Sequence, residues 1–314
     1  MPRIIYQSLS SVNEMRLTAL ITKPEWTHYR AALNLPLVVQ AEPTTGGSAY
    51  LDYLAANLPS AVAVIYALGE GTMLDIGREV AHRSGKPLVL VPTMINDDRV
   101  LRAGEGDTVI LDLEVISAAP SDQRGAGIVD VLSIVTALMD WGYAAQKNQL
   151  PPTQPFSAWG AGIAAGIVQQ ALKLAPGIGK GEVDSLKGLI TLLALTATLD
   201  NHLGHRRASQ GAEHLLADLL SKQPSSEGLP YAERLAAGIL ITSALHNRDV
   251  APLKGALEAA GVRSSAVKKA EALAALWDAP SAVRTLNAPP TILNDLEANP
   301  EKLAETLAKS TLSI

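Results

Sequence analysis

Cysteine is absent from this 314-residue chain, which excludes disulfide bonds and thiolate metal sites. Any metal must therefore be held by histidine, aspartate or glutamate. Only 4% of the residues are aromatic, so alanine and leucine carry most of the packing, which favours helices. No basic cluster occurs and the net charge is −5, which argues against nucleic acid and anionic membranes as partners. Small-molecule substrates are the expected ligands.

A signal sequence and a long apolar run are also lacking. The longest apolar stretch, residues 189–199, is too short to cross a bilayer. We therefore expect a cytoplasmic protein with no membrane partner. A hydrophobic content of 47% is ample for one large or two ordinary domains. A homo-oligomer stays an open expectation, because the sequence sets no oligomeric state.

The clearest local signal is an apolar run at residues 62–68 that meets Gly69, Glu70 and Gly71 and continues at once into a helical pattern at 72–84. An unbroken apolar run is typical of a strand buried on both faces of a parallel sheet. Strand, glycine turn and helix in succession point backbone N–H groups and a helix dipole at a phosphorylated ligand. The alternative is a tight turn of the kind that any α/β domain contains.

Strand-like and helix-like segments alternate through the first part of the chain. Further strands are expected at residues 17–22, 35–40, 87–92 and 108–113. Strands separated by helices predict parallel β-α-β units, and so a doubly wound Rossmann-like dinucleotide-binding domain over residues 1–122.

After Pro120 the strand patterns stop and long helical patterns rich in alanine and leucine follow. We expect an all-helical domain over residues 123–314. Its first helix is expected at 126–147, and a turn at 176–181 is expected to separate helices at 157–174 and 185–199.

Two acidic or basic side chains stand out in the helical part. Asp130 occupies the first turns of an apolar helix, either in a functional role or as an aspartate stabilised by the helix dipole. His214 has Asp218 one turn further on, which fits either a helix-surface pair or a metal-ligating imidazole oriented by a carboxylate.

Polar residues also follow the strand at 87–92. Thr93 comes directly after it, and Asn96, Asp97 and Asp98 come next, at the same edge of the sheet as the glycine turn. Ordinary turn formation is the alternative for these residues. In the helical part, the adjacent arginines 206–207 fit either a phosphate contact or a solvated loop.

The order of these motifs resembles the superfamily of iron-containing alcohol dehydrogenases, glycerol dehydrogenases and dehydroquinate synthases, and is most similar to its glycerol-1-phosphate dehydrogenase branch. The resemblance covers roughly residues 60–245. The segments that carry it, in order, are residues 69–75, 91–93, 96–98, 125–130, 140–141 and 206–214.

The resemblance implies a nicotinamide dinucleotide and a metal, zinc or iron. The turn of the family that binds the dinucleotide maps onto Gly69, Glu70, Gly71 and Thr72, with Asp75 and Thr93 in the same cofactor-binding set.

The catalytic roles of the family map onto Asp98, or Asp97 if the loop is shifted by one, for substrate, and onto Asp130 and His214 for metal. Tyr231 falls at the position of the third metal ligand. The family's metal would lower the pKa of a substrate hydroxyl so that its carbon can give hydride to the cofactor.

Two departures from the family pattern weaken these implications. Tyr231 stands where the family has histidine, and a neutral phenol is a poor zinc ligand, so the metal site is expected to be incomplete. Glu70 stands where the phosphate turn has glycine, so NAD(P) binding is expected to be weaker than with three glycines.

The functional prediction is an NAD(P)-dependent, metal-assisted oxidoreductase acting on a small polyol or polyol phosphate. The alternative is a divergent member of the fold without hydride chemistry, which binds a small ligand or a partner. A cyclising lyase like dehydroquinate synthase is disfavoured because no matching Gly-Gly-Lys loop is found.

Overall fold

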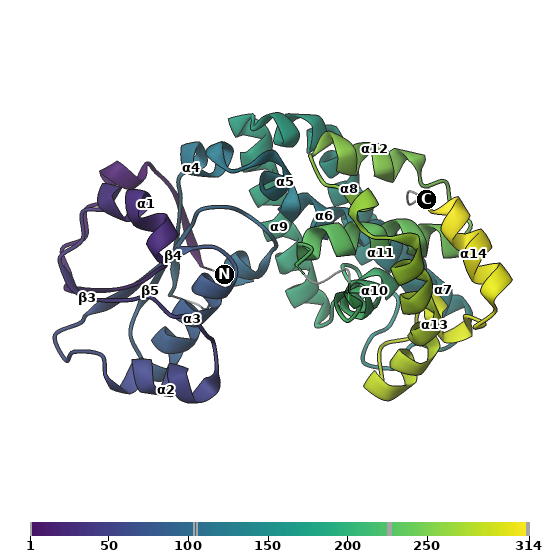
Figure 1. The fold of residues 1–314 in the computed structure, drawn as a ribbon, viewed down its shortest axis with the longest axis horizontal. Helices are drawn as coiled ribbons and strands as arrows, with labels where there is room; N and C mark the ends of the chain where they lie inside the picture. The colour runs from purple at the N-terminus through teal and green to yellow at the C-terminus, as the bar shows by residue number, and fades with distance from the viewer. Residues whose placement is uncertain (1, 103, 105, 225–227, 312–314) are drawn as a thin grey trace. The chain divides into compact units, whose positions relative to one another are not determined.

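The structure is a computed structural model that describes residues 2–102, 104, 106–224 and 228–311. It divides into two compact units, Met1–Pro120 and Ser121–Ile314, whereas the sequence-based division falls after residue 122. Both units are drawn in Figure 1, and each is described by itself.

The first unit is built on a six-stranded sheet in which all paired strands run parallel. In spatial order the strands are β1 (Arg3–Tyr6), β6 (Thr108–Leu111), β5 (Leu88–Pro92), β4 (Val64–Gly69), β2 (Thr18–Ile21) and β3 (Leu37–Ala41). Its α-helices are α1 (Thr27–Ala32), α2 (Ser48–Ala56), α3 (Thr72–Ser84) and α4 (Leu113–Ala118). The predicted α/β class with a doubly wound parallel sheet is confirmed, and β1 is an additional edge strand.

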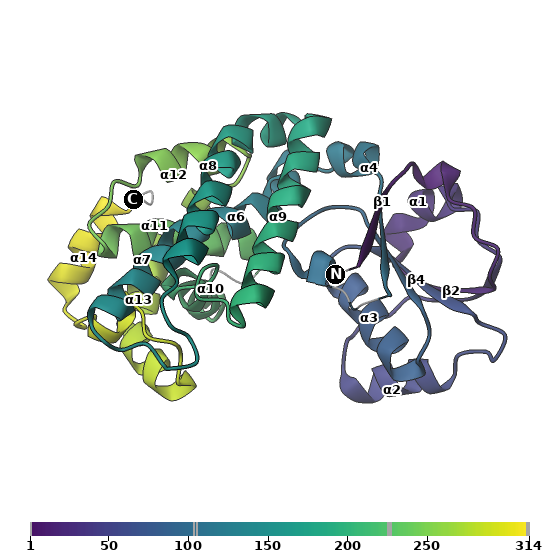
Figure 2. The ribbon, with the colours of Figure 1, turned by 180° about the vertical axis from the view of Figure 1, so that it is seen from behind.

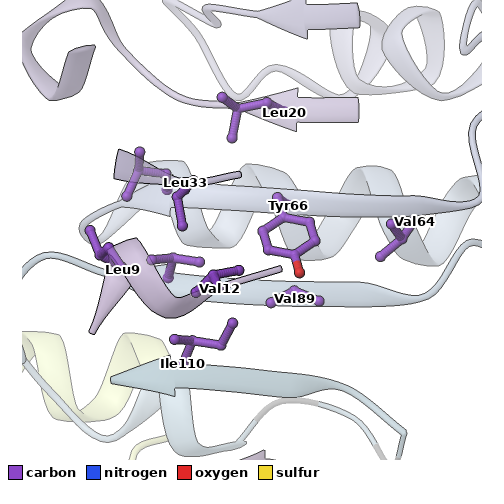
Figure 3. Close-up of a cluster of buried hydrophobic side chains, with 10 residues drawn as sticks. Leu9, Val12, Leu20, Leu33, Val64, Tyr66, Val89 and Ile110 are labelled. Carbon is purple, nitrogen blue, oxygen red and sulfur yellow. The ribbon is translucent and has the colours of Figure 1, made fainter. Parts of the chain in front are cut away.

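The central strand β4 is buried along its whole length, as an unbroken apolar run requires. Helix α3 packs against β4 and β5, while alternate residues of β4 point into a core on one face of the sheet, shown in Figure 3. That core comprises Leu9, Val12, Leu20, Leu33, Val64, Tyr66, Leu68, Val89, Val91 and Ile110. The Tyr66 hydroxyl donates to Glu14 Oε2 over 2.9 Å, so this polar atom is satisfied at the margin of the core.

The second unit contains only helices among its described residues, which confirms the predicted helical remainder. The helices are α5 (Ser121–Arg124), α6 (Ala126–Leu132), α7 (Ile134–Gln146), α8 (Ala158–Lys180), α9 (Val183–Leu203), α10 (Ala212–Ser221), α11 (Tyr231–Leu245), α12 (Ala251–Ala259), α13 (Lys269–Leu286) and α14 (Pro300–Lys309). Helices α8 and α9 pack side by side, and Figure 2 shows both of them well.

Two expectations about the helices are wrong. The single helix expected over residues 126–147 is divided at Ser133, whose hydroxyl donates back to the Asp130 carbonyl over 2.8 Å. The turn expected at 176–181 is absent, because α8 continues through Pro176 to Lys180. Pro176 lies on the exposed side of the helix, where water can solvate the carbonyl that loses its partner.

One segment, Ser121–Gln146, is long and apolar enough to cross a membrane, and its most apolar 18 residues have a mean hydropathy of 1.4. Within the protein, 61% of these 18 residues are buried. A core helix passes the same test of length and composition, so the segment is weak evidence for a membrane span.

Candidate functional site

The glycine turn after β4 adopts backbone conformations that other residues rarely take. Gly69 has φ of 143° and Gly71 has φ of 41°. Gly71 is the N-cap of α3 and provides no side-chain cap, so the first N–H groups of this 13-residue helix are not bonded by a capping side chain. A helix start of this kind can bind an anion, and the cofactor-binding role of Gly69, Gly71 and Thr72 stays a prediction.

Gly69 is also closely surrounded. A Cβ added there would lie 3.0 Å from Nε1 of Trp26 and 3.3 Å from Cβ of Met73. The Gly69 carbonyl accepts a hydrogen bond of 2.9 Å from the Thr93 amide, which links the ends of β4 and β5. The turn, Trp26 and Thr93 therefore form one compact group at the carboxyl edge of the sheet.

Four buried polar atoms at this edge have no hydrogen-bond partner within the described residues. They are Thr22 Oγ1, Trp26 Nε1, Thr93 Oγ1 and Asn96 Oδ1. Thr22 and Trp26 lie in the segment after β2, and Thr93 and Asn96 lie in the segment after β5. Thr22 and Thr93 are only 1% and 2% exposed. Because a buried polar group without a partner costs about 1 to 3 kcal/mol, such a cluster indicates a place where a ligand supplies the missing bonds.

Glu70 is held in place inside the turn. Its Oε2 accepts a hydrogen bond of 3.1 Å from Asn96 Nδ2, and the residue is half-buried. The carboxylate is therefore anchored beside the start of α3, where the dipole favours an anion. A bound diphosphate would meet this negative charge, as the sequence predicts.

The predicted acidic residues near the turn lie in two environments. Asp75 forms an ion pair of 2.9 Å with Arg78 one turn along α3. Asp98 is only 3% exposed. Asp75 and Asp97 line a small cavity of about 20 Å³ beside Gly71, which is about the size of one water molecule.

In the second unit, the structure brings Asp130 of α6 close to His214 of α10. The Nδ1 atom of His214 lies 2.8 Å from Glu213 Oε1. Burial of the ring works against its charged form, but the bond to Glu213 and the charges of Glu213 and Asp130 outweigh it, so the pKa of His214 is raised. The two predicted ligand positions therefore share one local environment.

Glu213 is the carboxylate that orients His214, whereas the sequence pattern favours Asp218. Asp218 is exposed, while Glu213 is fully buried, and its Oε1 also accepts a bond of 2.6 Å from the Gly211 amide. Neighbours in sequence do not normally face each other on a helix. Glu213 reaches His214 because both lie in the first turn of α10, where the Glu213 carboxylate folds back onto the helix start.

A buried ionic cluster supports this start of α10. Asp140 accepts bonds from the Ala212 amide (2.7 Å) and from His246 Nε2 (2.9 Å). Burial raises the pKa of Asp140 and the nearby Glu213 charge raises it further, against the lowering effect of the His246 bond. Arg207, 2% exposed, donates to the Pro290 carbonyl over 2.6 Å. Arg207 therefore has a structural contact, while its Nε and Nη1 atoms have no partner among the described residues, and the phosphate contact considered for residues 206–207 stays a prediction.

Tyr231, the predicted third metal position, is the first residue of α11 and is 39% exposed. The Arg234 guanidinium carbon lies 5.9 Å from the centre of its ring. Among the described residues, no group of three histidine, aspartate or glutamate side chains is placed to hold a metal ion. Asp130 and His214 supply two donors, so the residues do not fit a catalytic zinc or iron site that needs three.

No family model matches the chain. Its sequence is 28% identical to the glycerol-1-phosphate dehydrogenase of Pyrococcus abyssi over 64% of this chain and 61% of that protein. It is 27% identical to the glycerol-1-phosphate dehydrogenase of Methanothrix thermoacetophila over 69% of this chain and 62% of that protein. The chain therefore matches less than two thirds of the length of these relatives.

The structure is similar to a probable glycerol dehydrogenase from Sinorhizobium meliloti, with a TM-score of 0.68 at 16% identity, covering 98% of this chain and 96% of that one. It is also similar to an iron-containing alcohol dehydrogenase from Corynebacterium glutamicum, with a TM-score of 0.62 at 14% identity over 98% and 94% of the two chains. The sequence is therefore similar to glycerol-1-phosphate dehydrogenases, and the chain has the fold of iron-containing alcohol dehydrogenases. Its resemblance to their superfamily, which includes dehydroquinate synthase-like proteins, is confirmed.

In the first unit, Gly69 and Gly71 form a turn at the start of α3, and in the second unit Asp130 lies close to His214. Their roles in cofactor, substrate and metal binding stay predictions. The four buried polar atoms at the sheet edge and Glu213 are the features that the motifs did not reveal.

Proposed function

We propose that the chain is an NAD(P)-dependent oxidoreductase that acts on a small polyol or polyol phosphate. The similarity to glycerol-1-phosphate dehydrogenases and to the fold of glycerol dehydrogenases supports the reaction class. In this reaction the carbinol C–H bond gives a hydride to the nicotinamide ring and the hydroxyl gives up a proton. A cytoplasmic protein with small-molecule partners, and with no nucleic acid or membrane partner, is part of the same proposal.

The observation that carries the cofactor assignment is the cluster of unpartnered buried atoms around the glycine turn. Trp26 Nε1 is a donor, Asn96 Oδ1 is an acceptor, and the hydroxyls of Thr22 and Thr93 are both. A ribose or diphosphate offers matching oxygens, and the open space beside Gly71, where an added Cβ would meet nothing within 4 Å, lets a ligand approach the backbone. When bound, the nicotinamide would supply the hydride acceptor.

The residues of the second unit handle the substrate and its proton in this proposal. Glu213 accepts from Nδ1–H of His214, which leaves Nε2 as the atom that exchanges a proton with a substrate oxygen. Asp130 favours the protonated ring. No step is assigned to zinc or iron, because the third donor is missing among the described residues.

A steady-state assay tests the proposal. The full chain is mixed with NAD⁺ or NADP⁺ and with glycerol or glycerol 1-phosphate, with and without added zinc or ferrous ion, and the absorbance of the reduced nicotinamide is followed. We expect reduction with at least one pair, lost in His214→Ala and retained in Asp218→Ala, its exposed neighbour on α10. Dinucleotide binding without reduction of any pair would instead favour the alternative, a ligand-binding protein without hydride chemistry.

A further inference from the structure

Asp140 and Trp141 belong to the segments that carry the resemblance, yet the proposed reaction gives neither of them a role. Both lie in α7 and are fully buried. Burying a carboxylate is costly, because water no longer solvates its charge. Asp140 is therefore a costly buried group whose purpose must lie in the contacts that it makes.

The Asp140 carboxylate holds together three segments that are far from it in the sequence. Its Oδ2 accepts a bond of 2.7 Å from the Ala212 amide at the start of α10. Its Oδ1 accepts bonds from the Ile292 amide (2.8 Å) and from Nε2 of His246, which follows α11 (2.9 Å). A carboxylate can accept all three bonds because both of its oxygens are acceptors.

Helix α10 depends on Asp140 because its own N-cap residue, Gly211, has no side chain to cap it. Asp140 binds the first amide of the helix from outside, and Glu213 Oε1 accepts from the Gly211 amide over 2.6 Å. A Cβ at position 211 would lie 2.6 Å from Asp140 Oδ2 and 2.9 Å from Glu213 Oε2, so a capping side chain has no room there. A carboxylate on α7 therefore takes the place of a local cap.

His214 lies two residues after the amide that Asp140 binds. Its Nδ1 atom is held by Glu213 Oε1 over 2.8 Å. Successive residues of an α-helix are rotated by about 100° around its axis, so a helix start displaced by one residue would turn His214 by about 100°. Fixing the Ala212 amide therefore fixes the direction in which His214 points.

The loop that leads into α10 is held from the same part of α7. The ring of Trp141 packs edge-on against His205, with ring centres 5.3 Å apart. Arg207 Nη2 lies 3.4 Å from the carbonyl oxygen of Asp140. The two adjacent residues of α7 therefore contact both the loop before α10 and the start of the helix itself.

We propose that Asp140 is a positioning residue, which acts on His214 through the first turn of α10. The carboxylate holds the Ala212 amide so that Glu213 can bind Nδ1–H of His214, which leaves Nε2 for the substrate oxygen. This role rests on the proposed function, because that function uses the His214 ring. The placement of the ring can be measured without turnover, so the two proposals can fail separately.

Asp140→Asn tests this role, and Asp112→Asn is the matched control. Asp112 is also buried and accepts bonds from three backbone amides, those of Leu9 (2.8 Å), Glu114 (3.0 Å) and Val115 (3.3 Å), in the first unit. Asparagine has one acceptor oxygen, so in either variant its NH₂ group must face a backbone N–H. Both variants should therefore lose stability in urea unfolding.

Imidazole ¹⁵N spectra report the placement of His214. The chain has six histidines, and His214→Gln identifies the signals of this one. At a pH above the pKa of His214, the parent ring should carry its proton on Nδ1, where Glu213 holds it. Asp140→Asn should give a mixture of the two tautomers, whereas Asp112→Asn should keep the parent signals. An unchanged His214 tautomer in Asp140→Asn would overturn the proposal.

Kinetics give a second measurement. In Asp140→Asn kcat should fall about 10- to 100-fold, because the ring is displaced, while the Kd for the dinucleotide should not change. Asp112→Asn should keep the kcat of the parent. An equal fall in kcat in both variants would make Asp140 a purely structural residue and overturn the proposal. A parent without any reductase or dehydrogenase activity would instead contradict the proposed function, and the ¹⁵N spectra would still decide whether Asp140 positions His214.

Discussion

Neutralising Glu70 should tighten dinucleotide binding, because its carboxylate is anchored where a diphosphate would lie. The hydrogen bond from Asn96 fixes Glu70, and swinging it away would forfeit that bond, worth about 1 kcal/mol. Two unit charges about 6 Å apart, at an effective dielectric constant of about 40, repel by about 1.4 kcal/mol. Removing the charge should therefore lower the Kd for NAD⁺ or NADP⁺ by about tenfold.

Glu70→Gln and Glu70→Gly separate charge from shape. Calorimetric titration of the parent and both variants should show about tenfold tighter binding for Glu70→Gln, which keeps the length of the side chain and a contact to Asn96. Raising the salt concentration should shrink the difference from the parent. Tight binding by the parent together with no gain in Glu70→Gln would refute the electrostatic reasoning, as would a gain confined to Glu70→Gly, which would assign the effect to bulk.

Three further outcomes are expected. Elemental analysis should find well under one zinc or iron per chain in the parent and more in Tyr231→His; stoichiometric metal in both would place the third ligand elsewhere. Contacts with Arg16, first of all its hydrogen bond, lower the pKa of Glu14 to about 2 from 4.5. The ionised Glu14 therefore stabilises the fold above pH 4.5, and this stabilisation is lost as the pH falls towards 2. In urea unfolding, Glu14→Gln should lower the free energy of unfolding by up to about 3 kcal/mol near neutral pH and by little near pH 2. Gly211→Ala would set a methyl 2.6 Å from a buried carboxylate oxygen and should destabilise the chain by about 2 kcal/mol, whereas Gly142→Ala, with open space around it, should be neutral or stabilising; equal effects would contradict the packing described.

The fold followed from the sequence where its signals were long and periodic. The strand β4 was predicted because burial on both faces requires an unbroken apolar run. The helix α3 was predicted because its buried residues recur at helical spacing. Strand β1 has only four residues with both ends exposed, so no pattern distinguished it from a loop. Helix α8 passes through Pro176 because tertiary packing outweighs a local breaker on the solvent side.

The sequence predicted only those candidate site residues that belong to recognisable motifs. Gly69, Gly71, Asp130 and His214 carry types and spacings that match a family pattern. The partner of His214 did not follow from helical periodicity, since Glu213 acts through the special geometry of a helix start. The unpartnered atoms at the sheet edge come from two separate segments, one after β2 and one after β5, so only the folded chain brings them together.

The most direct test of the proposed dinucleotide site observes Trp26. The chain has four tryptophans, so a ¹⁵N spectrum should show four indole N–H signals, and Trp26→Phe identifies the one from Trp26. Because Trp26 Nε1 is buried beside Gly69 without a partner, binding of NAD⁺ or NADP⁺ should shift this signal as the indole gains a hydrogen bond. A Trp26 signal that does not move when saturating dinucleotide is added would contradict a cofactor site at the turn after β4.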